Sequence, residues 1–190
     1  MANTVGDALR KLHDKELAKA RLIERKNDAK GRLGEYLSER WLREDRGMEV
    51  VSWDQTCGTR NETAPPGGKR PDFVTEVVEA IFADAKIRSD GTVLAISDVE
   101  IAQYRATMAH YDVAHLVFLM IPLSDPLRLV TVHIDNLVTP ASVGGRPGHS
   151  VAIHPEFDPY TYLIPEAWWD DGIAMLRDTG FEQGELPVRT

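Results

Sequence analysis

The chain has 190 residues, of which 43% are apolar and 27% charged, and its formal net charge is -8. This length suits one hydrophobic core with appendages, and the composition is too apolar for wholesale disorder. The single cysteine, Cys57, excludes an internal disulfide and a cysteine-cluster metal site, so a cytoplasmic, reducing location is expected. The longest apolar run, residues 113–123, is too short to cross a bilayer, so no membrane role is expected.

Charge is distributed unevenly along the chain. Residues 8–32 contain nine Lys or Arg against four Asp or Glu, whereas residues 151–190 contain two against eight. The acidic total argues against a surface that binds nucleic acid everywhere, because affinity for phosphates comes mainly from Lys and Arg. The basic N-terminal region is the exception, and it is a candidate for contacts with a phosphate backbone.

The N-terminal quarter of the chain predicts helix. Residues 5–46 are rich in helix formers with periodic apolar positions, but Gly31 and Gly34 weaken the middle of this segment. We therefore expect a helical arm over residues 1–30 and a separate, core-facing helix over residues 31–45. The apolar positions of the arm require a partner, and either a homodimer through the arm or docking on nucleic acid would supply one.

The middle of the chain alternates strand and helix signals. Strands are expected at 49–53, 73–78 and 80–87, and residues 55–70 have the composition of a loop. Ser97 as N-cap with Glu100 three residues later predicts a capping box and a helix to about residue 110. Buried strands follow at 113–121 and 127–134. This order predicts an α/β fold with a mixed β-sheet flanked by helices.

The last fifty residues are expected to extend this core. Residues 140–149 have the composition of a Gly-rich loop, and Pro165 followed by Trp168 and Trp169 predicts a C-terminal amphipathic helix. The predicted organisation is therefore a core over residues 31–140 and a loop-and-helix extension over residues 141–190.

The chemically informative residues lie in the second and third predicted strands. Asp84 and Lys86 alternate along one strand and so share a face, and a hairpin would bring Asp72 beside them. Two carboxylates are hard oxygen ligands for Mg²⁺, which would lower the pKa of a bound water and neutralise charge on a phosphate. Lys86 would orient or help to deprotonate that water and stabilise the transition state.

The pair Pro71-Asp72, the tripeptide Asp84-Ala85-Lys86 and the order of elements resemble the PD-(D/E)xK superfamily of restriction-endonuclease-like nucleases. The resemblance covers residues 31–122 and implies an αβββαβ core. It implies that Asp72, Asp84 and the main-chain carbonyl of Ala85 hold Mg²⁺, with Mn²⁺ as a substitute.

The same resemblance implies two further catalytic residues. Glu35 matches a glutamate that many members contribute from the first core helix as a metal ligand, and Gln103, followed by Tyr104, matches a polar residue from the helix after the third strand. Each of these residues could also be an ordinary helical side chain.

The predicted function is a metal-dependent endonuclease that hydrolyses phosphodiester bonds of nucleic acid, with DNA favoured over RNA. Such activity would serve restriction, repair, recombination or mobile-element biology. The alternative is a catalytically inactive nuclease-fold module that binds a protein partner, which the acidic net charge would suit. The six histidines form no ligand pattern, and the glycine pairs at 67–68 and 144–145 lack the ending of a phosphate-binding P-loop.

Overall fold

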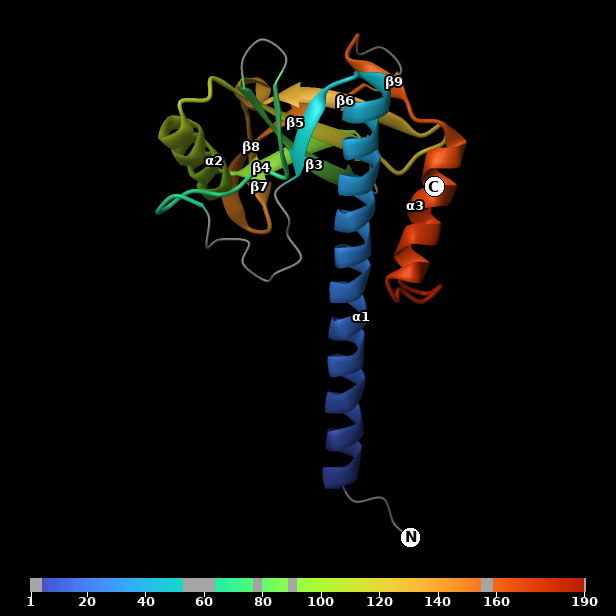
Figure 1. Cartoon of the computed structure of the whole chain (residues 1–190). Helices are drawn as coiled ribbons and strands as arrows, with labels where there is room; N and C mark the ends of the chain where they lie inside the picture. The colour runs from blue at the N-terminus through green and yellow to red at the C-terminus, as the bar shows by residue number, and fades with distance from the viewer. Residues whose placement is uncertain (1–4, 53–63, 77–79, 89–91, 155–158, 190) are drawn as a thin grey trace.

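The computed structural model describes residues 5–52, 64–76, 80–88, 92–154 and 159–189. The described chain is a mixed α/β fold in which helices cover a curled mixed sheet (Figure 1). No described helix combines the length and the apolar character that a membrane span requires. The helical elements are α1 (Val5–Arg40), the π-helical turn η1 (Trp41–Asp45), α2 (Asp98–Tyr111), the 3-10 turn η2 (Ile134–Asn136) and α3 (Glu166–Asp178).

The strands form two sheets. The larger sheet has the order β1-β2-β3-β5-β6-β9, in which β3 and β5 are parallel and every other neighbouring pair is antiparallel. The smaller antiparallel sheet has the order β4-β8-β7. The strands are β1 (Glu49–Ser52), β2 (Phe73–Glu76), β3 (Ala80–Arg88), β4 (Val93–Ser97), β5 (His115–Pro122), β6 (Arg128–His133), β7 (Thr139–Val143), β8 (Arg146–Ala152) and β9 (Thr161–Leu163).

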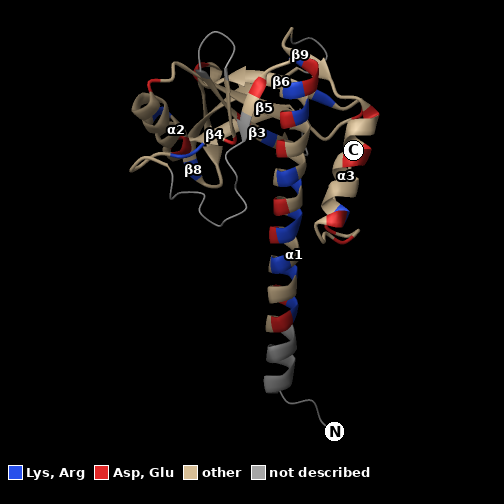
Figure 2. Cartoon of the chain, viewed as in Figure 1, with Lys and Arg blue, Asp and Glu red and all other residues tan. Residues whose placement is uncertain are grey.

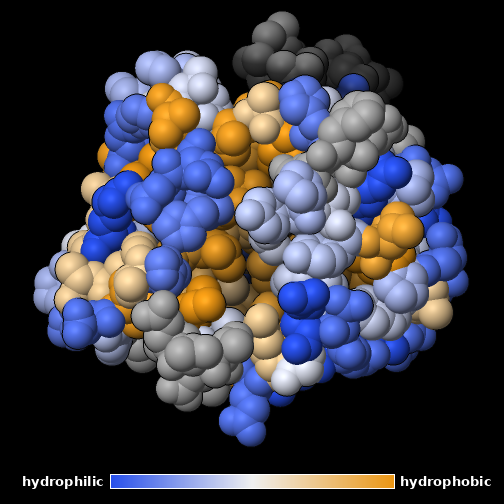
Figure 3. Space-filling view, turned by 90° about the horizontal axis from the view of Figure 1, so that it is seen from above, coloured by the Kyte–Doolittle hydropathy of each residue, from blue (hydrophilic) through white to orange (hydrophobic). Residues whose placement is uncertain are grey.

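The larger sheet is buried on both faces, which creates two hydrophobic clusters. On one face α1 and α3 pack against Leu119 and Ile121 of β5. On the other face α2 and the smaller sheet pack against Phe82 and Phe118. Viewed from above, apolar side chains lie mostly in depressions between hydrophilic ones (Figure 3). Strand β3 lies between the two clusters, so its alternate side chains face opposite helices.

Helix α1 is continuous, and the predicted break at Gly31 and Gly34 is wrong. A Cβ atom at Gly34 would lie 3.5 Å from Cβ of Ile87, so the helix approaches β3 closely there. Burial against the sheet and α3 offsets the roughly 1 kcal/mol that each helical glycine costs relative to alanine. The buried positions recur every four residues: Ala29, Leu33, Leu37 and Trp41.

The N-terminal half of α1 projects from the body of the molecule (Figure 1). All side chains from residue 13 to residue 28 are exposed, and burial begins at Ala29. Near the start of the buried part, the Arg25 guanidinium donates to the carbonyl of Gly180 at 2.8 Å and to Oε2 of Glu185 at 2.8 Å. Basic and acidic side chains are interleaved along this helix (Figure 2).

The segment predicted as a loop at 140–149 is instead the hairpin of β7 and β8. Gly144 and Gly145 form its two-residue turn with φ values of +57° and +78°, the positive values that a type I′ turn requires. The strands β4 and β9 were also not anticipated. Short strands of this kind are stabilised by pairing with distant segments, which local sequence patterns do not reveal.

The other predicted elements are confirmed where the structure describes them. Helix α2 begins after Ser97, whose Oγ accepts a hydrogen bond from the Glu100 main-chain nitrogen at 3.3 Å. Helix α3 follows Pro165, as expected. Cys57, the first part of the predicted loop, and the predicted strand positions 53, 77 and 78 lie outside the described residues.

Candidate active site

The β2-β3 hairpin brings Asp72 beside Asp84. Phe73 pairs with Ala83 in the antiparallel register, so position 72 lies opposite position 84, one residue beyond the paired strand. Phe73 and Ala83 belong to the cluster under α1, and strand alternation therefore directs both aspartates to the α2 face. Asp72 Oδ2 accepts a hydrogen bond from the main-chain nitrogen of Ala85 at 2.8 Å. This contact ties the two strands together at the site.

Asp84 is a buried carboxylate with 1% of its surface exposed. The Tyr104 hydroxyl donates to Oδ2 of Asp84 at 2.5 Å. The other oxygen, Oδ1, forms an ion pair with the Lys86 ammonium but accepts no well-directed hydrogen bond from the described residues. Burying a charged carboxylate is costly unless it is paired, and Lys86 supplies the pairing charge.

Lys86 is surrounded by acidic and hydroxyl groups. Its Nζ lies 3.3 Å from Glu100 Oε1 and 3.3 Å from the Tyr104 hydroxyl. Burial by itself would lower the pKa of Lys86, but the carboxylates of Asp84, Glu100 and Asp72 more than offset it and raise the pKa above the usual value. Lys86 is therefore a cation at neutral pH in this arrangement.

Glu100 and Lys69 belong to the site although sequence patterns assigned neither to it. Glu100 was predicted only as part of a capping box, yet its carboxylate contacts the ammonium groups of Lys69 and Lys86. Burial would raise the pKa of Glu100, but the two lysines lower it overall. Glu100 and Tyr104 are four residues apart on one helix face, which is the signal that could have grouped them.

A cavity of about 360 Å³ lies beside this cluster, and Lys69 and Lys86 line it whereas Glu100 and Tyr104 do not. Four of the five predicted catalytic residues line it, namely Asp72, Asp84, Lys86 and Glu35. Gln103 lies outside the lining, and its main-chain carbonyl accepts a hydrogen bond from the Lys69 nitrogen at 3.1 Å. The full lining is Asn27, Gly31, Glu35, Lys69, Arg70, Asp72, Asp84, Ala85, Lys86 and Arg88.

The donor atoms of this cavity agree in kind with a magnesium site. Within the described ranges, no group of three or more His, Cys, Asp or Glu side chains is arranged to hold a metal ion. Mg²⁺, however, is usually held by one or two carboxylates and retains several waters. Asp72, Asp84 and the carbonyl of Ala85 offer such a set of hard oxygens, and a metal at Asp84 Oδ1 would compete with the Lys86 ammonium that pairs with this oxygen.

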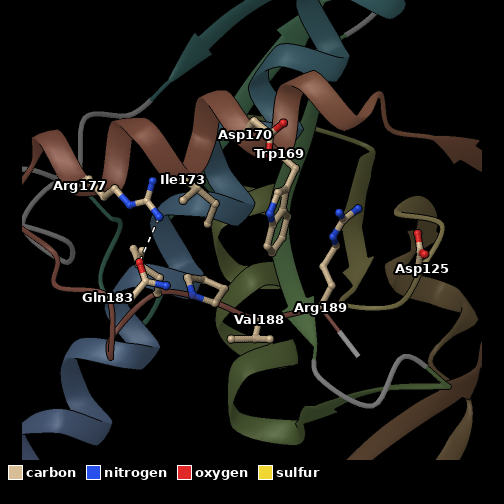
Figure 4. Close-up of a pocket in the computed structure, with 10 residues that line it drawn as sticks. Asp125, Trp169, Asp170, Ile173, Arg177, Gln183, Val188 and Arg189 are labelled. Carbon is tan, nitrogen blue, oxygen red and sulfur yellow. Dashed lines mark hydrogen bonds between the residues drawn. The ribbon is translucent and has the colours of Figure 1, made fainter.

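A larger cavity of about 820 Å³ lies between α3 and the C-terminal segment (Figure 4). Its two arginines are paired locally: Arg177 donates to Oε1 of Gln183 at 3.1 Å, and Arg189 forms an ion pair with Glu166. The Arg189 guanidinium also lies over the Trp169 ring, 5.2 Å from its centroid. No set of acids converges there with a buried cation among the described residues, so the smaller cavity is the better candidate for catalysis.

The smaller cavity places hard oxygen ligands beside partly buried cations, a combination suited to metal-assisted hydrolysis of a phosphodiester. No protein-family model matches the chain, and no curated protein matches it. The functional interpretation therefore depends on the residues of the cavity and their geometry.

Proposed function

We propose that the chain is a metal-dependent nuclease with a restriction-endonuclease-like core, acting on nucleic acid and on DNA in preference to RNA. The observation that carries the proposal is the meeting of Asp72, Asp84 and Lys86 in one cavity. The order α1, β1, β2, β3, α2, β5, with β4 of the smaller sheet inserted before α2, and the parallel pairing of β3 with β5 support it. The fold alone would not suffice, because function depends on the site.

Five residues that line the cavity, and the neighbouring Tyr104, have distinct roles in this proposal. Asp72, Asp84 and the carbonyl of Ala85 would hold Mg²⁺ or Mn²⁺, with Glu35 as a further ligand. An ion held there would lower the pKa of a bound water and would neutralise negative charge on the phosphate. Lys86, held cationic by its acidic neighbours, orients the water and stabilises charge in the transition state. Tyr104 fixes the orientation of Asp84 by its hydrogen bond.

The direct test is a cleavage assay on plasmid DNA, single-stranded DNA and RNA with Mg²⁺, with Mn²⁺ and with a chelator. We expect cleavage that requires the metal. Asp84→Asn should abolish cleavage and weaken Mn²⁺ binding measured by calorimetry, because it removes one of the two central carboxylates. Asp135→Asn is the matched control, since Asp135 is exposed and pairs with Arg105 outside the cavity.

Two results would count against the proposal. If Asp84→Asn cuts at the wild-type rate, the cavity is not the active site. If the folded wild-type chain cuts none of the three substrates with either metal, the catalytically inactive, protein-binding module becomes the better interpretation.

A further inference from the structure

The cavity contains more positive than negative side chains, in a protein whose total charge is negative. The chain has 22 Lys and Arg against 30 Asp and Glu. In the cavity lining the balance is reversed, with the cations Lys69, Arg70, Lys86 and Arg88 against the acids Glu35, Asp72 and Asp84. This lining therefore offers an anionic ligand more positive than negative side chains.

The main chain of Lys69 is hydrogen-bonded to α2. Its nitrogen donates to the Gln103 carbonyl at 3.1 Å, and its carbonyl accepts from the Thr107 hydroxyl at 2.8 Å. The preceding residue, Gly68, lies so close to α2 that a Cβ there would be 2.5 Å from Thr107 Oγ1. Lys69 is therefore held against α2 and does not behave as a freely moving surface lysine.

The ammonium groups of Lys69 and Lys86 converge on one carboxylate oxygen, Oε1 of Glu100. Burial lowers the pKa of Lys69, and the positive charge of Lys86 is the second cause of this lowering. Lys86 also pairs with Asp84, whereas Lys69 pairs with Glu100, so an anion with several acceptor oxygens could take the place of the Glu100 carboxylate at Lys69. A phosphate group has those oxygens.

We propose that Lys69 and Lys86 form a phosphate subsite of the cavity, in which Lys69 binds the nucleic-acid backbone and Glu100 pairs with both lysines when no phosphate is present. This inference rests on the proposed nuclease function and adds a substrate-binding residue to it. Lys69 supplies a charge-assisted hydrogen bond, and Glu100 competes with the phosphate for it.

The test measures binding without catalysis. Fluorescein-labelled single-stranded and duplex oligonucleotides are titrated with protein in buffer that contains a chelator. Fluorescence anisotropy gives Kd at each of several KCl concentrations. Lys69→Ala should reduce the slope of log K against log salt by about 0.7 for single strands or 0.9 for duplex, the loss of one phosphate contact. Lys69→Arg should restore the slope. Glu100→Gln should lower Kd because it removes the competing carboxylate.

Arg105→Ala is the control, since it also removes one positive charge, but from an exposed side chain of α2 that lies outside the cavity. The subsite is refuted if Lys69→Ala has the wild-type slope, if Arg105→Ala changes the slope equally, or if Glu100→Gln weakens binding. If the wild type cleaves nucleic acid but Lys69→Ala binds with the wild-type salt slope, only the phosphate subsite is refuted. A wild type that neither binds nor cleaves refutes the proposed function as well.

Discussion

At the residue scale, the central feature is the buried pair of Asp84 and Lys86. Strand propensity disfavours aspartate, and Asp84 nevertheless interrupts an apolar run in the middle of β3. In the structure this carboxylate accepts a hydrogen bond from Tyr104 and forms an ion pair with Lys86. The negative charge of Asp84 is therefore balanced inside the fold. Asp84 departs from strand propensity at a position that lines the cavity, and such a departure is expected of a functional residue.

Replacing Lys86 should separate the proposed catalysis from the proposed metal binding. Lys86→Ala should reduce cleavage by about 10²–10⁴-fold, the usual worth of a positioned acid or base group, while Mn²⁺ still binds. The variant should also unfold at a lower temperature without metal, because Asp84 loses its buried partner. Added Mn²⁺ should raise the unfolding temperature more in Lys86→Ala than in the wild type.

Calorimetric titration, a nicking assay and thermal unfolding together check this prediction. A loss of activity smaller than tenfold would mean that another cation performs the role proposed for Lys86. Arg88, two positions along β3, would then be the next residue to replace.

The ion pairs of Glu100 should make stability depend on pH in a defined direction. Its folded pKa lies below the unfolded value of about 4.5, because Lys86 and Lys69 outweigh the opposing effect of burial. The unfolded chain therefore takes up this proton first as pH falls, and the stabilisation is complete above pH 4.5 and lost below it. Denaturant unfolding of wild type and Glu100→Gln should show a stability gap at neutral pH that narrows as pH falls through the folded pKa. A gap that is constant with pH contradicts the prediction.

At the element scale, two glycines test how the helices and strands are fitted together. A Cβ at Gly148 of β8 would lie 2.4 Å from the Ile96 carbonyl oxygen of β4, whereas nothing lies within 4 Å of a Cβ at Gly31. Gly148→Ala should therefore destabilise the fold by about 1–3 kcal/mol through overpacking. Gly31→Ala should stabilise it by about 0.5–1 kcal/mol, since alanine is the better helix former. Denaturant unfolding measures the change in the free energy of unfolding for both variants. If that change has the same sign in both, this description of the packing is contradicted.

At the scale of the whole molecule, the projecting arm is separable from the folded body. Deletion of residues 1–24 keeps Arg25 and its bonds to Gly180 and Glu185, so thermal unfolding should change little. If the arm contacts nucleic acid, the deletion should also lower the salt dependence of binding, because Lys and Arg of the arm no longer displace counterions. An unchanged slope together with loss of a dimer in sedimentation would assign the arm to assembly instead.

The sequence by itself determined the local features of this protein. Alternation along β3 was enough to place Asp84 and Lys86 on one face, and the spacing to Pro71-Asp72 was enough to predict a hairpin that brings Asp72 close. The N-cap at Ser97 and the helix after Pro165 followed from patterns a few residues long. Each of these depends on neighbours in the chain, which a sequence displays directly.

Tertiary structure decided the continuity of α1 and the pairing of β8 with β4. Helix propensity at Gly31 and Gly34 amounts to about 1 kcal/mol each, and burial of the stripe from Ala29 to Trp41 is worth more. Tertiary structure also decided the neighbours of the lysines. Lys69 and Glu100 are 31 residues apart, and they meet because the loop before β2 is bonded to α2. Contacts between distant segments are set by packing, and short-range periodicity carries no information about them.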